Sequence, residues 1–170
     1  PIKVKIEQGT LADLLDLCMR QSPGYAWAAR DGVVHVYGVE DWKRPSNLFN
    51  LVISSFEAQN ETIGSIDLKL YMALIREREG PVGIAGVYSE NPELERKRLS
   101  IKVQRATVRE ILNRMVALHG DVVWIARVFP ERLSRVPQGG LWLLLPMSQL
   151  GQPQVRSPEY LKTLLRLSHR

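Results

Sequence analysis

The chain has only one cysteine, Cys18, and only three histidines among its 170 residues. A single thiol cannot form an internal disulfide or a multi-cysteine metal site. The histidines, His35, His119 and His169, show none of the short spacings that place two zinc ligands side by side. The sequence therefore predicts no disulfide, no metal site and no cofactor, and we interpret Cys18 as a small apolar residue of a helix.

Catalytic motifs are also missing from the sequence. It contains no nucleophile elbow, no P-loop and no glycine-rich dinucleotide-binding fingerprint, and the glycines of "GPVGIAG" are not followed by the Lys-Ser/Thr pair of a phosphate loop. We therefore expect a protein that is not an enzyme. A catalytic site that only folding assembles remains as an alternative.

Long apolar runs are absent as well. The longest, "LWLLLPM" at residues 141–147, has the length of a strand, whereas a membrane-spanning helix needs about 20 apolar residues. The chain starts at Pro1 and shows no signal peptide. We expect it to be a part of a longer protein, with an export signal or membrane anchor in the missing part.

The positive charge of the chain is mild. Its net charge is +5, from 23 basic and 18 acidic residues, and the only basic cluster, Arg96 to Arg98, is flanked by acidic residues. Such a dispersed charge favours a solvated surface over a nucleic-acid interface. Nucleic-acid binding through Trp42, Arg44 and this cluster is kept as a second interpretation.

One pattern of apolar residues occurs twice. When Thr10 is placed over Thr107, residues 4–30 align with residues 101–127 without a gap, and "WAAR" falls on "WIAR". The coinciding apolar pairs are Val4 with Ile101, Ile6 with Val103, Leu11 with Val108, Leu14 with Ile111, Leu15 with Leu112, Cys18 with Met115, Met19 with Val116 and Trp27 with Trp124. We interpret the two segments as copies of one unit.

Each copy predicts the same β-α-β-β order of elements. Alternating apolar residues predict a half-buried strand before each threonine. Thr107 with Glu110 fits a capping box, and Thr10 with Asp13 fits a looser one. An apolar stripe at helical spacing follows, facing a sheet, and a strand comes after the glycine-containing break. In the first copy, Asp31-Gly32 predicts a tight hairpin.

The copies are separated by a middle segment. Within residues 41–98, "DWKRPSN" predicts a loop, "LFNLVISSFEA" a strand, residues 60–79 a helix, residues 83–88 a short strand, and "SENPELERKR" a charged loop. This segment allows a weaker third copy with Thr62 over Thr10, although Asp67 then replaces Leu15. The predicted organisation is a module at 1–40, the middle segment at 41–98, a module at 99–146, and a linker with a short helix at 147–170.

The predicted fold class is α+β, with two related β-α-β-β modules that have small mixed sheets and are joined by a helix-containing segment. Strand alternation places Trp27 and Trp124 on core faces, and Arg30 and Arg127 on outer faces. Trp42 is predicted to be exposed in a loop, as a binding anchor. The candidate interaction residues are Trp42, Arg44, Arg30 and Arg127.

The segments "IEQGTLADLLDLCMRQSPGYAW" and "VQRATVREILNRMVALHGDVVW" resemble the secretin and TonB short N-terminal domain, over residues 2–38 and 99–146. This resemblance implies a non-catalytic interaction module of a bacterial cell envelope, in the periplasm, that docks to partner proteins through sheet edges or helix faces. The resemblance implies no catalytic residues in this sequence. The long middle segment has no place in a simple pair of such modules, and a cytoplasmic location stays as the alternative. The identity of the partner and the oligomeric state are left open.

Overall fold

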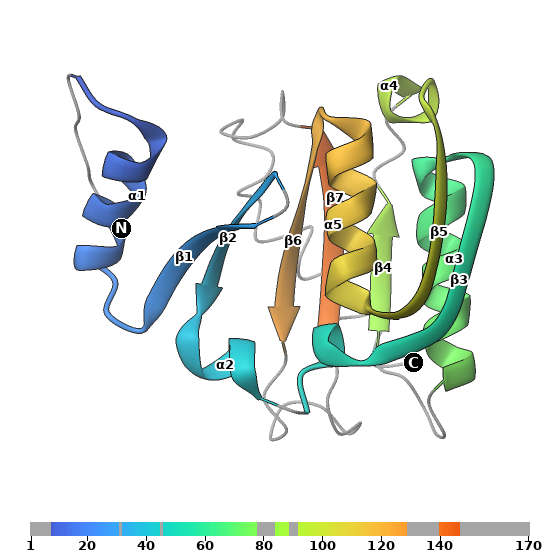
Figure 1. The fold of residues 1–170 in the computed structure, drawn as a ribbon, viewed down its shortest axis with the longest axis horizontal. Helices are drawn as coiled ribbons and strands as arrows, with labels where there is room; N and C mark the ends of the chain where they lie inside the picture. The colour runs from blue at the N-terminus through green and yellow to red at the C-terminus, as the bar shows by residue number, and fades with distance from the viewer. Residues whose placement is uncertain are drawn as a thin grey trace. The chain divides into compact units, whose positions relative to one another are not determined.

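The computed structural model describes residues 8–30, 32–44, 46–77, 84–88, 92–128 and 140–146. These residues form an α+β fold of short helices and small sheets, as predicted (Figure 1). The chain divides into two units, Pro1–Asn47 and Leu48–Arg170.

The first unit contains a helix, a hairpin and a single helical turn. Its elements are α1 (Leu11–Arg20), β1 (Tyr25–Arg30), β2 (Val33–Gly38) and α2 (Val39–Lys43). β1 and β2 pair antiparallel with Trp27 opposite Val36, so the predicted hairpin is confirmed. Gly32 in the turn has a φ of 77°, a conformation that glycine adopts without steric cost. The strand predicted around Val4 and Ile6 lies outside the described residues.

Helix α1 begins at the predicted capping box. The Thr10 hydroxyl accepts from the Asp13 backbone N–H, and the Asp13 carboxylate accepts from the Thr10 backbone N–H at 2.7 Å. However, no residue of α1 is fully buried, and Tyr25 on the face of Trp27 is 57% exposed. The prediction that this face forms a core is therefore wrong for Tyr25, while Trp27 is half-buried.

Two predictions for the end of the first unit are corrected. Residues 39–43 form α2 where a loop was predicted from residue 41, with Glu40 and Asp41 in the first turn and Lys43 in the last, which suits the helix dipole. Alternation with Val34 and Val36 predicts His35 on the exposed face of its strand. The side chain is only 6% exposed, and the ring of Trp42 from α2 lies 5.5 Å from it. A short helix that follows a strand can cover that strand, and periodicity in the strand alone does not reveal it.

The described residues of the second unit form two sheets and two main helices. Its elements are η1 (Leu48–Asn50), β3 (Val52–Thr62), α3 (Ile63–Glu77), β4 (Ile84–Tyr88), α4 (Pro92–Glu95), β5 (Arg98–Thr107), α5 (Val108–His119), β6 (Val122–Val128) and β7 (Gly140–Pro146). β3 and β5 pair antiparallel as a long ribbon. In the other sheet, of order β4-β7-β6, β7 runs parallel to β4 and antiparallel to β6. The helix α4 replaces part of the predicted charged loop.

The core of the second unit lies around α3 and α5. The two helices contact each other, α3 contacts β3 and β4, and α5 contacts β5 and β6, so the helices bridge the two sheets. Buried apolar side chains come from β3, α3, β5, α5, β6 and β7: Ile53, Phe56, Ile63, Ile66, Leu70, Leu74, Leu99, Ile101, Val103, Val108, Ile111, Leu112, Met115, Val122 and Leu144. Burying each such side chain contributes about 1.5–3 kcal/mol to the hydrophobic driving force, before the cost in conformational entropy.

Helix α5 confirms the predicted local signals. Thr107 and Glu110 form a capping box in both directions, and the predicted apolar stripe is buried. Gly120 ends the helix with a φ of 87°, in the left-handed conformation that glycine favours. The end of a helix is a favourable place for a charged histidine. His119, however, is only 4% exposed, and its burial lowers its pKa and favours the neutral ring.

Helix α3 also follows a threonine. The helix was predicted over residues 60–79 and spans Ile63–Glu77, and the Thr62 hydroxyl accepts from the Ser65 backbone N–H at 3.3 Å. Asn60 and Arg105 have φ values of 54° and 50°, and each stands two positions before the threonine that precedes the next helix. The strand-to-helix corners after β3 and β5 therefore share an unusual backbone conformation.

None of the helices in the described ranges has the length and apolar character needed to cross a membrane. The helix predicted near the C-terminus lies outside these ranges.

Candidate interaction site

Trp42, the predicted binding anchor, is half-buried in α2 instead of projecting from a loop. Its ring stacks on Tyr37 with centroids 4.1 Å apart and an interplanar angle of 30°, and the edge contact with His35 fills another side. Such aromatic contacts contribute about 0.5–1.5 kcal/mol beyond buried area, so Trp42 has a packing role within the first unit.

The three predicted arginines occupy different places. Arg44 follows α2, and its Nη2 lies 3.5 Å from Asp41 Oδ1, an exposed ion pair of little energetic weight. Arg30 is exposed at the end of β1, on the strand face opposite to Trp27, as alternation predicts. Arg127 lies in β6 opposite Leu141, and its side chain is outside the described part of the structure.

One residue of the basic cluster, Arg96 to Arg98, makes a contact within the fold. Lys97 Nζ donates to the carbonyl of His119 at the end of α5, where a cation also suits the helix dipole. Arg96 and Arg98 are exposed. Trp42 and Arg44 belong to the first unit and this cluster to the second.

A groove lies between α3 and β3 in the second unit, and its volume is about 370 Å³. It is lined by Ser55, Phe56 and Glu57 of β3 and by Leu68, Lys69, Met72, Ala73 and Arg76 of α3. The helical residues form two adjacent rows at spacings of four, Leu68, Met72 and Arg76 in one and Lys69 and Ala73 in the other.

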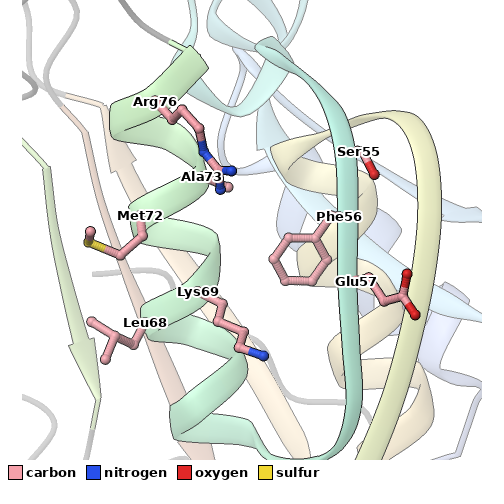
Figure 2. Close-up of a pocket in the computed structure, with 8 residues that line it drawn as sticks. All are labelled: Ser55, Phe56, Glu57, Leu68, Lys69, Met72, Ala73 and Arg76. Carbon is pink, nitrogen blue, oxygen red and sulfur yellow. The ribbon is translucent and has the colours of Figure 1, made fainter.

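The floor of the groove is buried, and its rim is exposed. Phe56 and Ala73 are 4% and 3% exposed, whereas Leu68 and Met72 are 62% and 54% exposed. Figure 2 shows the Phe56 ring pointing from β3 toward α3, and Lys69 and Arg76 extending from α3 toward β3. Leu68 and Met72 extend from α3 on the side away from β3 (Figure 2), so these two exposed apolar side chains do not face the Phe56 ring.

The groove borders a strand edge without a ladder partner. In the described part of the chain β3 pairs with β5 alone, so its other edge, on the side of α3, is unpaired. At one end of this edge, the Glu77 carboxylate accepts from the backbone N–H of Ser54 and from its hydroxyl, each at 3.1 Å. The last residue of α3 thus takes the place that a neighbouring strand would fill at Ser54.

The charges around the groove are unequally paired. Lys69 Nζ forms an ion pair with Glu61, and this bond, together with the Ser65 hydroxyl, lowers the pKa of Glu61. Glu57 lies 3.1 Å from Lys102 on β5. Within the described ranges, Arg76 is the lining cation that has no carboxylate within ion-pair distance.

The sequence analysis did not find this groove. The exposed positions Leu68, Met72 and Ile75 follow helical spacing and could have indicated a second apolar face on α3. The edge beside them depends on β3 pairing with β5, which is a long-range contact and leaves no local signal.

The described residues contain no group of three or more His, Cys, Asp or Glu side chains placed to hold a metal ion. Comparisons with protein-family models, with curated proteins and with solved structures gave no match to this chain.

Proposed function

We propose that this chain is a non-catalytic protein–protein interaction module of a bacterial cell-envelope protein. The observations that carry this proposal are the edge of β3 that has no ladder partner among the described residues, and the two exposed apolar side chains of α3, Leu68 and Met72. Natural proteins usually shorten, charge or cover such edges, because an open edge is a template for pairing with another chain. A partner that covers this edge accounts for both features.

The repeated units belong to the same proposal. The two aligned segments share a capping box at Thr10 and Thr107, and in each a tryptophan of the following strand donates to the helix before it. The cap at Thr62 supports the middle segment as a third copy. We infer that the chain is built from copies of one unit.

The compartment follows from the resemblance of the repeated segments to the secretin and TonB short N-terminal domain. Modules of that family serve as docking domains in the bacterial envelope, which favours a periplasmic location for this chain. The groove itself lies in the middle segment, outside the residues that carry the resemblance, so its partner is a separate question from the family's usual contacts.

Site-specific photo-crosslinking in cells tests the interaction. A photoreactive amino acid at Met72 is expected to give one defined protein adduct in cells of the host. Leu118, an exposed apolar residue of α5 at 46% exposure, provides the matched control position and is expected to give none.

Formation of the adduct at Met72 must also depend on the neighbouring apolar side chain, Leu68. Leu68→Glu, introduced beside the crosslinker at Met72, is expected to abolish it while the circular dichroism spectrum of the purified protein stays unchanged. Adducts of equal yield at Met72 and Leu118, or none at any exposed position of the second unit, would contradict the proposal. Protease access to the protein in spheroplasts, compared with lysed cells, tests the periplasmic location.

A further inference from the structure

We propose that the first unit is a self-association surface, at which the strand predicted around Val4 and Ile6 pairs antiparallel with the same strand of a second copy of this chain. Helix α1 of each copy then covers the paired strands. This inference goes beyond the proposed function, because it concerns another surface, and it takes from that function only the inferred repeat of one unit.

The second unit already contains two aligned segments that are joined in this way. β3 with α3 and β5 with α5, which we call the internal pair, share the order of a strand, a threonine and a helix. The two strands run antiparallel side by side, and the two helices contact each other (Figure 1). Thr62, which ends β3, lies opposite Arg98, which begins β5. Thr107, which ends β5, lies opposite Val52, which begins β3, so each strand ends beside the start of the other.

The register of the internal pair is that of a two-fold dimer. When Thr62 is placed over Thr107, Glu57 falls on Lys102. Glu57 and Lys102 also lie opposite each other, with 3.1 Å between the carboxylate and the ammonium group. Equivalent residues that face each other mark the axis of a two-fold arrangement. The internal pair therefore shows, within one chain, how two aligned units can associate.

Pairing accompanies burial of the helix stripe. The first apolar position of the helix is fully buried in both members of the internal pair, at Ile63 and Val108, whereas the aligned Leu11 of α1 is 58% exposed. Met115 of α5 is fully buried, and the aligned Cys18 is half-buried. No residue of α1 is buried. Among the described residues, α1 thus has the same stripe without the cover that α3 and α5 receive.

The charges of the predicted strand fit the same register. In the internal pair, Gln104 lies opposite Ser55 and donates to its hydroxyl at 3.2 Å. The alignment of Thr10 with the other two threonines places Lys3 on Ser55 and Glu7 on Gln104. Lys3 of each copy then faces Glu7 of the other. Opposite charges across neighbouring strands stabilise their pairing, and a two-fold dimer contains this contact twice.

The axis of the dimer carries one repulsion. Lys5 aligns with both Glu57 and Lys102, so it faces Lys5 of the second copy. Like charges directly opposite each other weaken strand pairing. A single substitution at this position can therefore strengthen a mixed dimer, which gives the arrangement a specific test.

Sedimentation equilibrium of the whole chain is expected to show a dimer whose dissociation constant depends on these charges. Lys3→Glu is expected to weaken the dimer about tenfold, because both contacts with Glu7 become repulsive, and Lys3→Glu combined with Glu7→Lys should restore it. Arg114→Glu, at an exposed position of α5, is the control and should have no effect.

A mixture of the Lys5→Glu variant with the unaltered chain tests the axis. The mixed dimer should form in preference to either pure dimer, because a glutamate then faces a lysine, as Glu57 faces Lys102 in the internal pair. Native mass spectrometry of the mixture measures the amount of each dimer.

Leu11→Glu tests the role of α1. A glutamate at the first helical position suits the helix dipole, so the helix is kept, but the dimer would bury the charge and should weaken by more than about tenfold. Leu118→Glu makes the same change at another exposed leucine and should leave the dimer unchanged. Alkylation of Cys18 should slow as the concentration of the chain rises, because the dimer covers the thiol. Circular dichroism confirms that each variant is folded.

A chain that stays monomeric at millimolar concentration overturns the inference. A dimer that neither Leu11→Glu nor Lys3→Glu weakens also overturns it, as does a mixture in which Lys5→Glu gives no preference for the mixed dimer. A dimer that Met72→Glu dissociates instead would place the interface on α3 and refute the first unit as the surface. The adduct at Met72 in cells does not depend on association through the first unit, so this inference and the proposed function can fail separately.

Discussion

The indole Nε1 of Trp124 on β6 donates a hydrogen bond to Asn113 Oδ1 on α5 at 3.0 Å. The same relation joins Trp27 of β1 to Asp16 of α1 at 2.7 Å. In each case the tryptophan fixes its strand against the helix that precedes it, and Trp124 also packs its ring 5.6 Å from that of Phe49. The two aligned segments thus share a polar contact at equivalent positions in addition to their apolar pattern.

The Trp124–Asn113 contact is expected to stabilise the second unit. Trp124→Phe keeps a ring beside Phe49 but removes the donor, and Asn113→Ala removes the acceptor. A double-mutant cycle by urea denaturation should give a coupling energy of about 0.5–1.5 kcal/mol, as for a neutral hydrogen bond. If the two effects add within about 0.3 kcal/mol, the hydrogen bond makes no net contribution.

The capping box of α5 should contribute measurably to the free energy of unfolding. Thr107→Ala removes the acceptor for the Glu110 backbone N–H and is expected to lower the free energy of unfolding by about 1 kcal/mol. Thr107→Ser keeps the hydroxyl and serves as the control, with a much smaller effect. Equal losses in both variants would show that the threonine methyl group, and not the cap, is responsible.

The capping box of α1 should respond to pH. Hydrogen bonds from the Thr10 backbone N–H and then from its hydroxyl lower the pKa of Asp13 below the ordinary value of an aspartate, 3.8. Because the pKa of this carboxyl is lower in the folded chain than in the unfolded chain, the contact stabilises the fold fully at pH values above the unfolded pKa. This stabilisation is lost as the pH falls through the folded pKa. NMR titration should show the α1 amide signals shifting together with the Asp13 carboxyl. In Asp13→Asn this shift should be absent.

His119 should make the second unit less stable in mild acid. Burial is the main cause of its lowered pKa, nearby Lys97 acts in the same direction, and the Leu94 backbone and Asp121 oppose them. Because the folded pKa lies below the unfolded value of 6.5, the unfolded chain binds more protons just below pH 6.5, and stability falls as pH decreases through that value. Denaturation of His119→Leu at pH 7.5 and pH 5.5 should show a smaller difference than the unaltered chain. An unchanged difference would assign the pH dependence to other groups.

Truncation of equivalent leucines in the two aligned segments should lower the free energy of unfolding by different amounts. Leu112 of α5 is fully buried, and Leu112→Ala is expected to cost about 2–5 kcal/mol through lost contact and a cavity. Leu15 of α1 is only half-buried, so Leu15→Ala should cost less than half as much. Tryptophan fluorescence and circular dichroism during urea denaturation can measure both. A larger loss at Leu15 would contradict the described burial of α1.

Much of the local structure could be predicted from the sequence because its causes are local. A threonine followed three positions later by an acid starts α1 and α5, since the two side chains satisfy backbone groups within one turn. Glycine ends α5 because it adopts a positive φ. Alternation and helical spacing gave the α+β class and most strands.

The errors arose where a distant segment determines the environment. His35 and Trp42 were expected to be exposed, but α2 brings their rings together. The stripe of α5 is buried while the aligned stripe of α1 is not, although the two patterns are nearly the same. Hydrophobic spacing shows which face can be buried, and only the packing of other elements shows whether it is.

The sequence by itself determined where α1 and α5 begin, which faces are apolar and which fold class results, because these depend on backbone sterics and neighbours within a few positions. Only the tertiary structure decided that β5 pairs with β3, that β4 joins β7 in parallel, and that an open groove lies beside α3. These features depend on contacts between residues far apart in the chain, whose free energy is shared among many side chains.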